Sequence, residues 1–215
     1  MSNFQGVANT LFIPLEARIF VSGKFPEYFY DAKALSLAPH ITDDGIRKKS
    51  SEYSFMASVA RYYNIDSMTR VFLKKHKHCN IIHLGAGLET TYHRLQGEDM
   101  QNIHFYEVDL PEVIKMRRAL LGTGTNEILI GGDMFEFHWA EIIDTTLPSL
   151  LIVIGVFQYF SEEKVVRLIG DLRNLFAQAE LIFDATNEIG LVYANKYVKK
   201  TGNTDALMRF YINDS

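Results

Sequence analysis

The chain has 215 residues, of which 47% are hydrophobic, which is enough for one domain with a sizeable core. Its formal net charge of −4 argues against partners that are held by charge, such as nucleic acid or an anionic membrane surface. The single cysteine, Cys79, excludes an internal disulfide. With no signal-peptide pattern at the N-terminus, and no uncharged run long enough to span a bilayer, we expect a cytoplasmic protein.

Residues 1–75 are predicted to form an N-terminal helical lid or cover. A helix is expected to start after Asp31, whose carboxylate can cap its first turn. From 49 to 75 the apolar residues recur at helical spacing. The sequence Asn64-Ile65-Asp66 predicts a break that divides this stretch into two helices.

Residues 76–215 alternate between strand and helix patterns, which predicts a Rossmann-like α/β core with a parallel sheet and helices on both faces. The five strands are expected at about 80–84, 103–108, 127–130, 149–155 and 180–185.

A glycine-rich turn follows the first of these strands. Gly85, Ala86 and Gly87 come directly after an apolar run, and a helical pattern follows them. Glycines let a ligand approach the backbone, and a helix N-terminus adds free N–H groups. The dinucleotide fingerprint needs a third glycine where this chain has Thr90. The turn therefore favours S-adenosylmethionine, which carries no phosphate, over NAD(P), which stays an alternative.

Acidic side chains follow the next two strands. Glu107 and Asp109 share one face of the second strand, and either can accept both hydroxyls of a ribose. Asp109 is the preferred one because it stands at the strand tip. Asp133 follows the third strand and can accept from an adenine amino group. Because parallel strands end at one edge of the sheet, these groups predict an adenosine-binding crevice.

Several blocks carry a resemblance to a known family. The chain resembles class I S-adenosylmethionine-dependent methyltransferases of the leucine carboxyl methyltransferase family, and more closely the bacterial branch with polyketide-type O-methyltransferases. The blocks are Thr10–Arg18, Ala60-Arg61, Leu84–Thr90 with Arg94-Leu95, Tyr106–Val113 and Gly155–Tyr159. They imply a Rossmann-like sheet whose last strands are truncated here, with a partial C-terminal cap.

The resemblance also implies roles for single positions. Arg61 would bind the methionine carboxylate of the cofactor, and Gly85, Ala86 and Gly87 its methionine part. Asp109 with Leu110 would hold the ribose, and Asp133 with Met134 the adenine. Ile154 stands where the family has a glutamate that contacts the cofactor's amino group, and Glu89 where it has an aspartate.

The expected function is O-methylation of a carboxylate, or of a hydroxyl, on a small molecule such as a polyketide-type metabolite. An ionised carboxylate needs no strong base, so the sequence identifies no catalytic residue. Tyr159 is a candidate for lining the transfer site, with a core position as the alternative; a phenolic acceptor would need a base such as His93 or His138. The oligomeric state stays open.

Other features of the sequence bear on two alternatives, a metal site and a non-catalytic binding role. His76, His78, Cys79 and His83 match no zinc spacing, so no metal site is predicted. A degenerate methyltransferase fold that binds a ligand or partner without turnover is the rival function, and Ile154 together with the short C-terminal part favours it.

Overall fold

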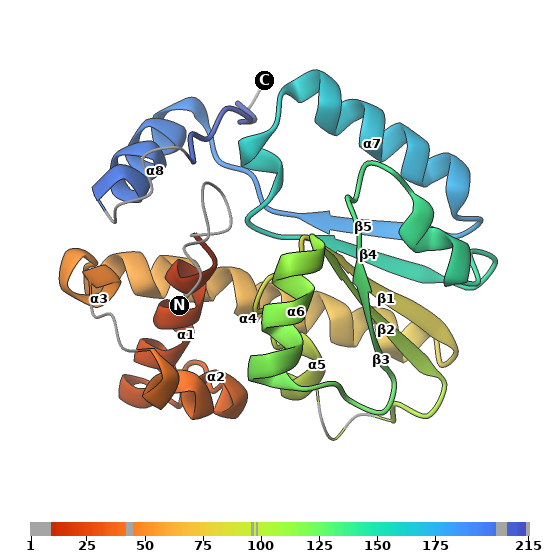
Figure 1. Cartoon of the computed structure of the whole chain (residues 1–215), viewed down its shortest axis with the longest axis horizontal. Coiled ribbons are helices and arrows are strands. Elements are labelled where there is room, and N and C mark those ends of the chain that lie inside the picture. Colours follow the sequence, from red (N-terminus) through yellow and green to blue (C-terminus); the bar gives the residue numbers. More distant parts are fainter. Residues whose placement is uncertain (1–9, 42–44, 96, 98, 201–205, 214–215) are drawn as a thin grey trace.

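The computed structural model describes residues 10–41, 45–95, 97, 99–200 and 206–213. Its centre is a sheet of five parallel strands in the order β3-β2-β1-β4-β5 (Figure 1). The strands are β1 (Cys79–Leu84), β2 (Ile103–Asp109), β3 (Glu127–Gly131), β4 (Ser149–Val153) and β5 (Ala179–Phe183). The predicted α/β class and all five predicted strands are confirmed.

The strand order reverses beside β1, which has β2 on one side and β4 on the other. Parallel pairing brings His83 of β1 opposite Glu107 of β2 and Ile152 of β4. The carboxyl ends of the strands therefore open together at one edge. In open parallel sheets ligands bind at such a reversal point.

Helices cover both faces of the sheet, as predicted. They are α1 (Phe12–Lys24), α2 (Ala32–Leu37), α3 (Gly45–Lys49), α4 (Glu52–Lys75), α5 (Thr91–Arg94), α6 (Pro111–Leu121), α7 (Glu162–Leu175) and α8 (Glu188–Lys200), with short 3-10 turns η2 (Ala38–His40), η3 (His138–Ile142) and η4 (Phe157–Tyr159). Neighbouring strand residues point to opposite faces. Ile81 accordingly belongs to the cluster under α4, and Ile82 to the cluster under α7.

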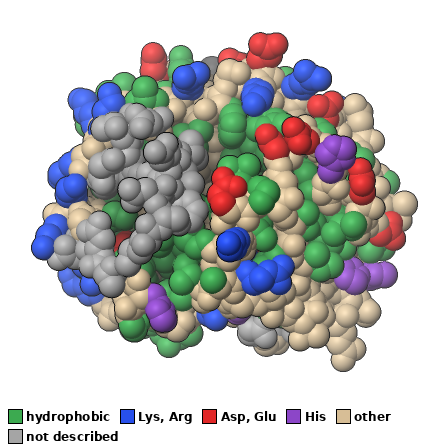
Figure 2. Space-filling model, in the orientation of Figure 1, with side chains coloured by type: hydrophobic (Ala, Val, Ile, Leu, Met, Phe, Trp, Pro, Cys, Tyr) green, Lys and Arg blue, Asp and Glu red, His purple; other side chains and the backbone are tan. Residues whose placement is uncertain are grey.

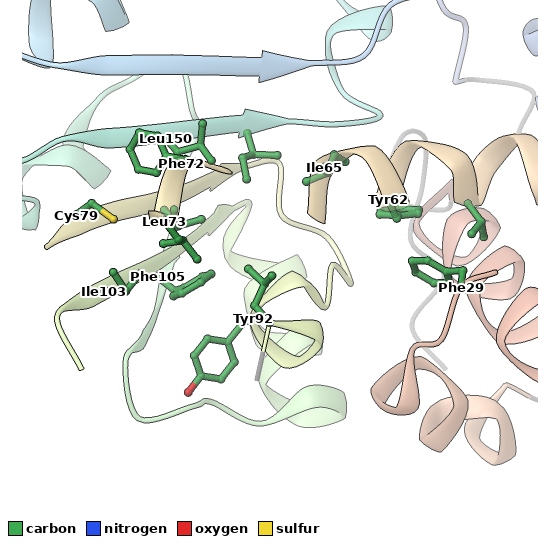
Figure 3. Close-up of a cluster of buried hydrophobic side chains, with 14 of the residues drawn as sticks. Phe29, Tyr62, Ile65, Phe72, Leu73, Cys79, Tyr92, Ile103, Phe105 and Leu150 are labelled. Carbon is green, nitrogen blue, oxygen red and sulfur yellow. The ribbon is translucent and has the colours of Figure 1, made fainter. Parts of the chain in front are cut away.

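The cluster under α4 joins the N-terminal helices to the sheet (Figure 3). Its buried members include Tyr62, Phe72, Leu73, Cys79, Ile103, Phe105 and Leu150. On the other face, the helix α7 contributes Val165, Leu168 and Leu172 to a second cluster. Because α4 shares one core with the strands, it covers the sheet directly. A boundary between residues 75 and 76 stays a prediction, and residues 1–9 of the predicted lid lie outside the described residues.

Two helix predictions were wrong. The expected break at Asn64-Ile65-Asp66 is absent, since α4 runs unbroken from Glu52 to Lys75. Ile65 is buried on its apolar face, and Asp66 accepts two hydrogen bonds from Arg94, at 2.8 and 2.9 Å. Tertiary contacts therefore hold these residues in the helix. The helix expected right after the glycine turn begins only at Thr91 and is short.

Local capping follows the sequence more closely. Asp31 caps α2 through a hydrogen bond from the Ala34 N–H to its Oδ1, at 2.8 Å, as expected. Ser51 and Ser54 form a reciprocal capping box at the start of α4. Within the described part of the chain, no helix is both long and apolar enough to cross a membrane.

Candidate active site

A cavity of about 350 Å³ opens at the carboxyl ends of β1, β2 and β4. It is lined by the glycine turn, by residues that follow β2, β3 and β4, and by side chains of α1 and α4. Of the sequence-predicted residues, the cavity wall contains Arg61, Gly85, Ala86, Gly87, Asp109, Leu110, Asp133, Met134, Ile154 and Tyr159. Residues chosen from separate blocks of the sequence thus meet around one space.

The glycine turn is fixed in place by the end of β2. The N–H groups of Gly85 and Ala86 both donate to the carbonyl oxygen of Val108, at 2.9 and 3.0 Å. Gly85 and Gly87 have φ values of +73° and +51°, which side-chain-bearing residues rarely adopt. A Cβ on Gly87 would lie 2.7 Å from the Leu11 side chain. The turn therefore needs glycine, both for its backbone and for its space.

Asp109 joins the glycine turn to the tip of β2. Its Oδ2 accepts from the Gly87 N–H and its Oδ1 from the Leu110 N–H, both at 2.7 Å. Burial raises the pKa of this carboxyl, while the two backbone N–H groups oppose that shift. Each carboxylate oxygen can accept a second hydrogen bond, so the group can still take ribose hydroxyls.

Glu107 lies outside the cavity, although it shares a strand face with Asp109. Its side chain is fully buried, and its Oε1 lies 3.2 Å from Nη2 of Arg117 and 3.3 Å from Nδ1 of His83. The carboxylate is therefore committed to a buried charge cluster. Of the two acids that the sequence left open, only Asp109 stands at the cavity wall.

The cavity wall beyond β3 combines an acid with apolar side chains. Asp133 is exposed and accepts from the Phe135 N–H at 2.9 Å, which turns the chain after Gly132. Met134 is buried beside it. Phe135 and Phe160, which also line the cavity, have ring centroids 4.8 Å apart. An apolar slot with one carboxylate suits a planar base that carries an amino group.

Arg61 reaches the cavity from α4. Its Nη1 lies 2.6 Å from Oδ2 of Asp184, and Ser58 accepts from its Nε and Nη2. Burial lowers the pKa of this guanidinium, but Asp184, together with Tyr62 and Tyr159, opposes burial and leaves the pKa raised. Arg61 thus keeps its charge at the cavity wall.

Tyr159 lies at the cavity wall, on η4. Burial raises the pKa of its hydroxyl, and a hydrogen bond with Thr10 opposes that shift. The hydroxyl is therefore neutral at physiological pH. The two histidines considered as bases lie elsewhere: His93 follows the glycine turn on α5, and His138 is exposed on η3, where it pairs with Glu141 at 3.0 Å. Neither lines the cavity.

Sequence reasoning gave no role to three further charged groups at the cavity wall. Arg18, Glu89 and His83 all line it. Arg18 donates to the Leu88 carbonyl oxygen at 2.7 Å, and Glu89 lies 2.8 Å from Nη2 of Arg94. Burial would raise the pKa of Glu89, but Arg94 and Arg18 hold it well below its usual range. In the sequence, the feature that could have revealed this group is Arg18, a charged residue on the buried face of α1.

Comparisons with known proteins agree with this geometry. The family model of leucine carboxyl methyltransferase matches residues 12–173. The tetracenomycin polyketide synthesis O-methyltransferase TcmP of Streptomyces glaucescens is 26% identical over 204 residues, covering 93% of this chain and 74% of that protein. Leucine carboxyl methyltransferase 1 of Bos taurus is 26% identical over 155 residues, covering 57% of this chain and 47% of that protein.

A solved structure shows the same fold. A protein assigned as a methyltransferase from Thermobifida fusca YX superposes with a TM-score of 0.58 at 21% identity, covering 91% of this chain and 74% of that one. The fold is that of the class I S-adenosylmethionine-dependent methyltransferases. The chain belongs to the leucine carboxyl methyltransferase family. It spans about three quarters of TcmP and less than half of the bovine protein.

S-adenosylmethionine is the cofactor that this family indicates, and the residues present fit it. A Cβ at Gly85 or Gly87 would collide with Val156 or Leu11, so only glycine allows the backbone to turn at this cavity wall. Asp109 and Asp133 stand at the β2 and β3 side of the cavity, and Arg61 stands at the β4 side. The acids suit the hydroxyls and the amino group of adenosine, and the guanidinium suits a carboxylate.

Proposed function

We propose that the protein transfers a methyl group from S-adenosylmethionine to an oxygen atom of a small molecule, a carboxylate or a hydroxyl, in the cytoplasm. The observation that carries the proposal is the hydrogen bond from the Gly87 N–H to Asp109, which combines the glycine turn and the ribose acceptor in one cavity wall. The likeness to TcmP, an O-methyltransferase of tetracenomycin polyketide synthesis, supports oxygen as the acceptor and a polyketide-type metabolite as the substrate class.

In this proposal, the cofactor supplies an electrophilic methyl group on a sulfonium, and the protein supplies binding and orientation. Asp109 accepts from the ribose hydroxyls, Asp133 accepts from the adenine amino group, and Arg61 pairs with the methionine carboxylate. The glycine turn lets the ligand approach the backbone. Catalysis comes from alignment of the acceptor oxygen with the methyl group and from exclusion of water.

An acceptor that is already ionised agrees best with the groups at the cavity wall. A carboxylate needs no base at neutral pH. Tyr159, whose pKa is raised, can donate a hydrogen bond to an acceptor oxygen but cannot act as a base at that pH. His93 and His138 lie outside the cavity, and His83 at its wall is buried beside Glu107. We therefore favour carboxyl over hydroxyl methylation.

A small-molecule acceptor is favoured over nucleic acid or a membrane. The cavity, at about 350 Å³, is of a size that small ligands fill. On the face drawn in Figure 2, hydrophobic side chains occupy much of the middle, with acidic ones and some Lys or Arg among them, and the other Lys and Arg are scattered along the left and upper edges. A nucleic-acid groove would need a basic stripe.

The test of the proposal is calorimetric titration of the protein with S-adenosylmethionine. We expect saturable binding by the wild type and strongly weakened binding by Asp109→Ala, because the ribose loses its charged acceptor. If neither protein produced heat at high micromolar concentration, the enzyme proposal would be overturned.

Turnover separates the enzyme from the non-catalytic alternative, which the uncharged Ile154 favours. Methyl transfer from labelled S-adenosylmethionine to a panel of carboxylic acids and phenols would support the enzyme. Tight binding of the cofactor without transfer to any acceptor in the panel would support a binding module instead.

A further inference from the structure

Asp184 follows β5 directly and connects two parts of the cavity wall. Its Oδ2 accepts from Nη1 of Arg61 at 2.6 Å, and its Oδ1 accepts from the Gly155 N–H at 2.8 Å. Arg61 belongs to α4, whereas Gly155 belongs to the turn after β4. One carboxylate therefore holds both a cation and a turn that line the cavity.

The register of the sheet explains why the acid stands there. Val153 of β4 pairs with Phe183 of β5, so the next residues of the two chains, Ile154 and Asp184, leave the sheet side by side. Ile154 lines the cavity but carries no charge. The negative charge at this edge is therefore supplied by the neighbouring strand. The Asp184 side chain is only 18% exposed, so water screens its pairing with Arg61 less than on an open surface.

Arg61 keeps hydrogen-bond donors for a ligand. A guanidinium has five N–H bonds. Within the described residues, its contacts to the Ser58 carbonyl oxygen, the Ser58 hydroxyl and Asp184 involve one N–H each from Nε, Nη2 and Nη1. One N–H on each terminal nitrogen remains. Since Arg61 lines the cavity, these two donors suit an anionic group of a ligand.

The pair stands opposite the nucleoside-binding acids. Asp109 ends β2 and Asp133 follows β3, on one side of β1. Arg61 and Asp184 meet at the ends of β4 and β5, on the other side. A ligand that spans the reversal point thus places its nucleoside at the first pair and its other end at the second.

We propose that Asp184 is a positioning residue for the amino-acid end of the cofactor. It holds Arg61 in the pose that receives the methionine carboxylate, and it fixes the Gly155 turn beside that end. This inference rests on the proposed function, because it requires a ligand with a carboxylate attached to an adenosine. Asp184 does not act on the nucleoside itself.

Two nucleosides test the inference. S-adenosylhomocysteine has the amino-acid end, and 5′-methylthioadenosine lacks it. We expect Asp184→Asn to weaken binding of S-adenosylhomocysteine about tenfold, the loss typical of one charge-assisted hydrogen bond. Binding of 5′-methylthioadenosine should change less than about twofold. The matched control is Asp171→Asn, which should alter neither affinity. Asp171 is a half-exposed aspartate of α7 that lies 3.8 Å from Arg167.

A double-mutant cycle separates positioning from a structural role. In an Arg61→Ala background, Asp184→Asn should no longer weaken S-adenosylhomocysteine binding, because no guanidinium is left to position. Equal losses for both nucleosides, the same loss in both backgrounds, or no loss at all would overturn the inference. A wild type that binds neither nucleoside would overturn the proposed function, and this inference with it.

Discussion

Asp109 and Glu107 stand two residues apart on β2, and the fold gives them different surroundings. Asp109 lines the cavity and accepts two backbone N–H groups, whereas Glu107 is buried against Arg117 and His83. The sequence placed both on one strand face, but only the packing of α6 over β2 shows that the deeper acid is covered. Removing each charge should therefore have different effects.

The prediction at this scale compares two isosteric substitutions. Asp109→Asn should weaken S-adenosylmethionine binding by about 1.5–3 kcal/mol, the contribution of a charged hydrogen-bonding partner. It should also lower the melting temperature, because the amide nitrogen of asparagine cannot accept from the Gly87 or the Leu110 N–H. Glu107→Gln should leave affinity within about twofold but lower the melting temperature, because Arg117 loses a buried partner. Calorimetry and thermal melts measure both effects. The reverse pattern of affinities would show that Glu107 holds the ligand.

Among the helices, α4 shows what the sequence could not reveal. Its apolar spacing correctly predicted a helix, but the break expected at Asn64-Ile65-Asp66 is absent. Asp66 is buried there, which is costly for an acid without a partner. That partner, Arg94, is 28 residues away in sequence and meets Asp66 only in the folded chain. A contact between distant residues also explains why α5 is short. Arg18 donates to the carbonyl oxygen of Leu88, which is 70 residues away in sequence, and this hydrogen bond holds the loop before α5.

The prediction for these elements concerns Arg94. Its side chain is 4% exposed and lies within 3.2 Å of Asp31, Asp66 and Glu89. Arg94→Met should reduce the free energy of unfolding by about 3–5 kcal/mol, because buried carboxylates lose their cation. Arg94→Lys should retain part of the stability, since a lysine keeps the charge but not the planar fork. Urea denaturation measures both; equal stability of Arg94→Met and the wild type would contradict the account.

For the whole molecule, the strands of the sheet could be predicted from the sequence. The side-chain contacts between distant residues could be predicted only in part. Short apolar runs between glycines and acids located every strand within two residues. The signal is clearest for β1 and β4, which are buried along their whole length, because such strands are nearly continuous in hydrophobicity. The positions of Asp109, Asp133 and Arg61 at one cavity followed from strand ends and family resemblance. The Arg61–Asp184 pair did not, since it joins residues 123 positions apart.

The buried charge cluster beneath the cavity predicts how stability depends on pH. His83 of β1 faces Glu107 of β2, Arg117 of α6 and Glu89 of the glycine turn. Burial and Arg117 lower its pKa, but Glu107 and Glu89 outweigh them and raise the pKa above 6.5. The folded state therefore binds this proton more tightly than the unfolded state does. The resulting stability is complete below about pH 6.5 and is lost as pH rises through the folded value.

We expect the difference in free energy of unfolding between the wild type and His83→Gln to fall steadily above about pH 6.5, in urea titrations at several pH values. His138→Gln is the matched control. Glu141 raises the pKa of that histidine too, but the pair is exposed and screened by water, so its removal should scarcely change the pH profile. A His83→Gln profile parallel to that of the wild type from pH 6 to 9 would contradict this account, because it would show that folding leaves the pKa of His83 unchanged. The cluster would then hold Glu107 through Arg117 alone.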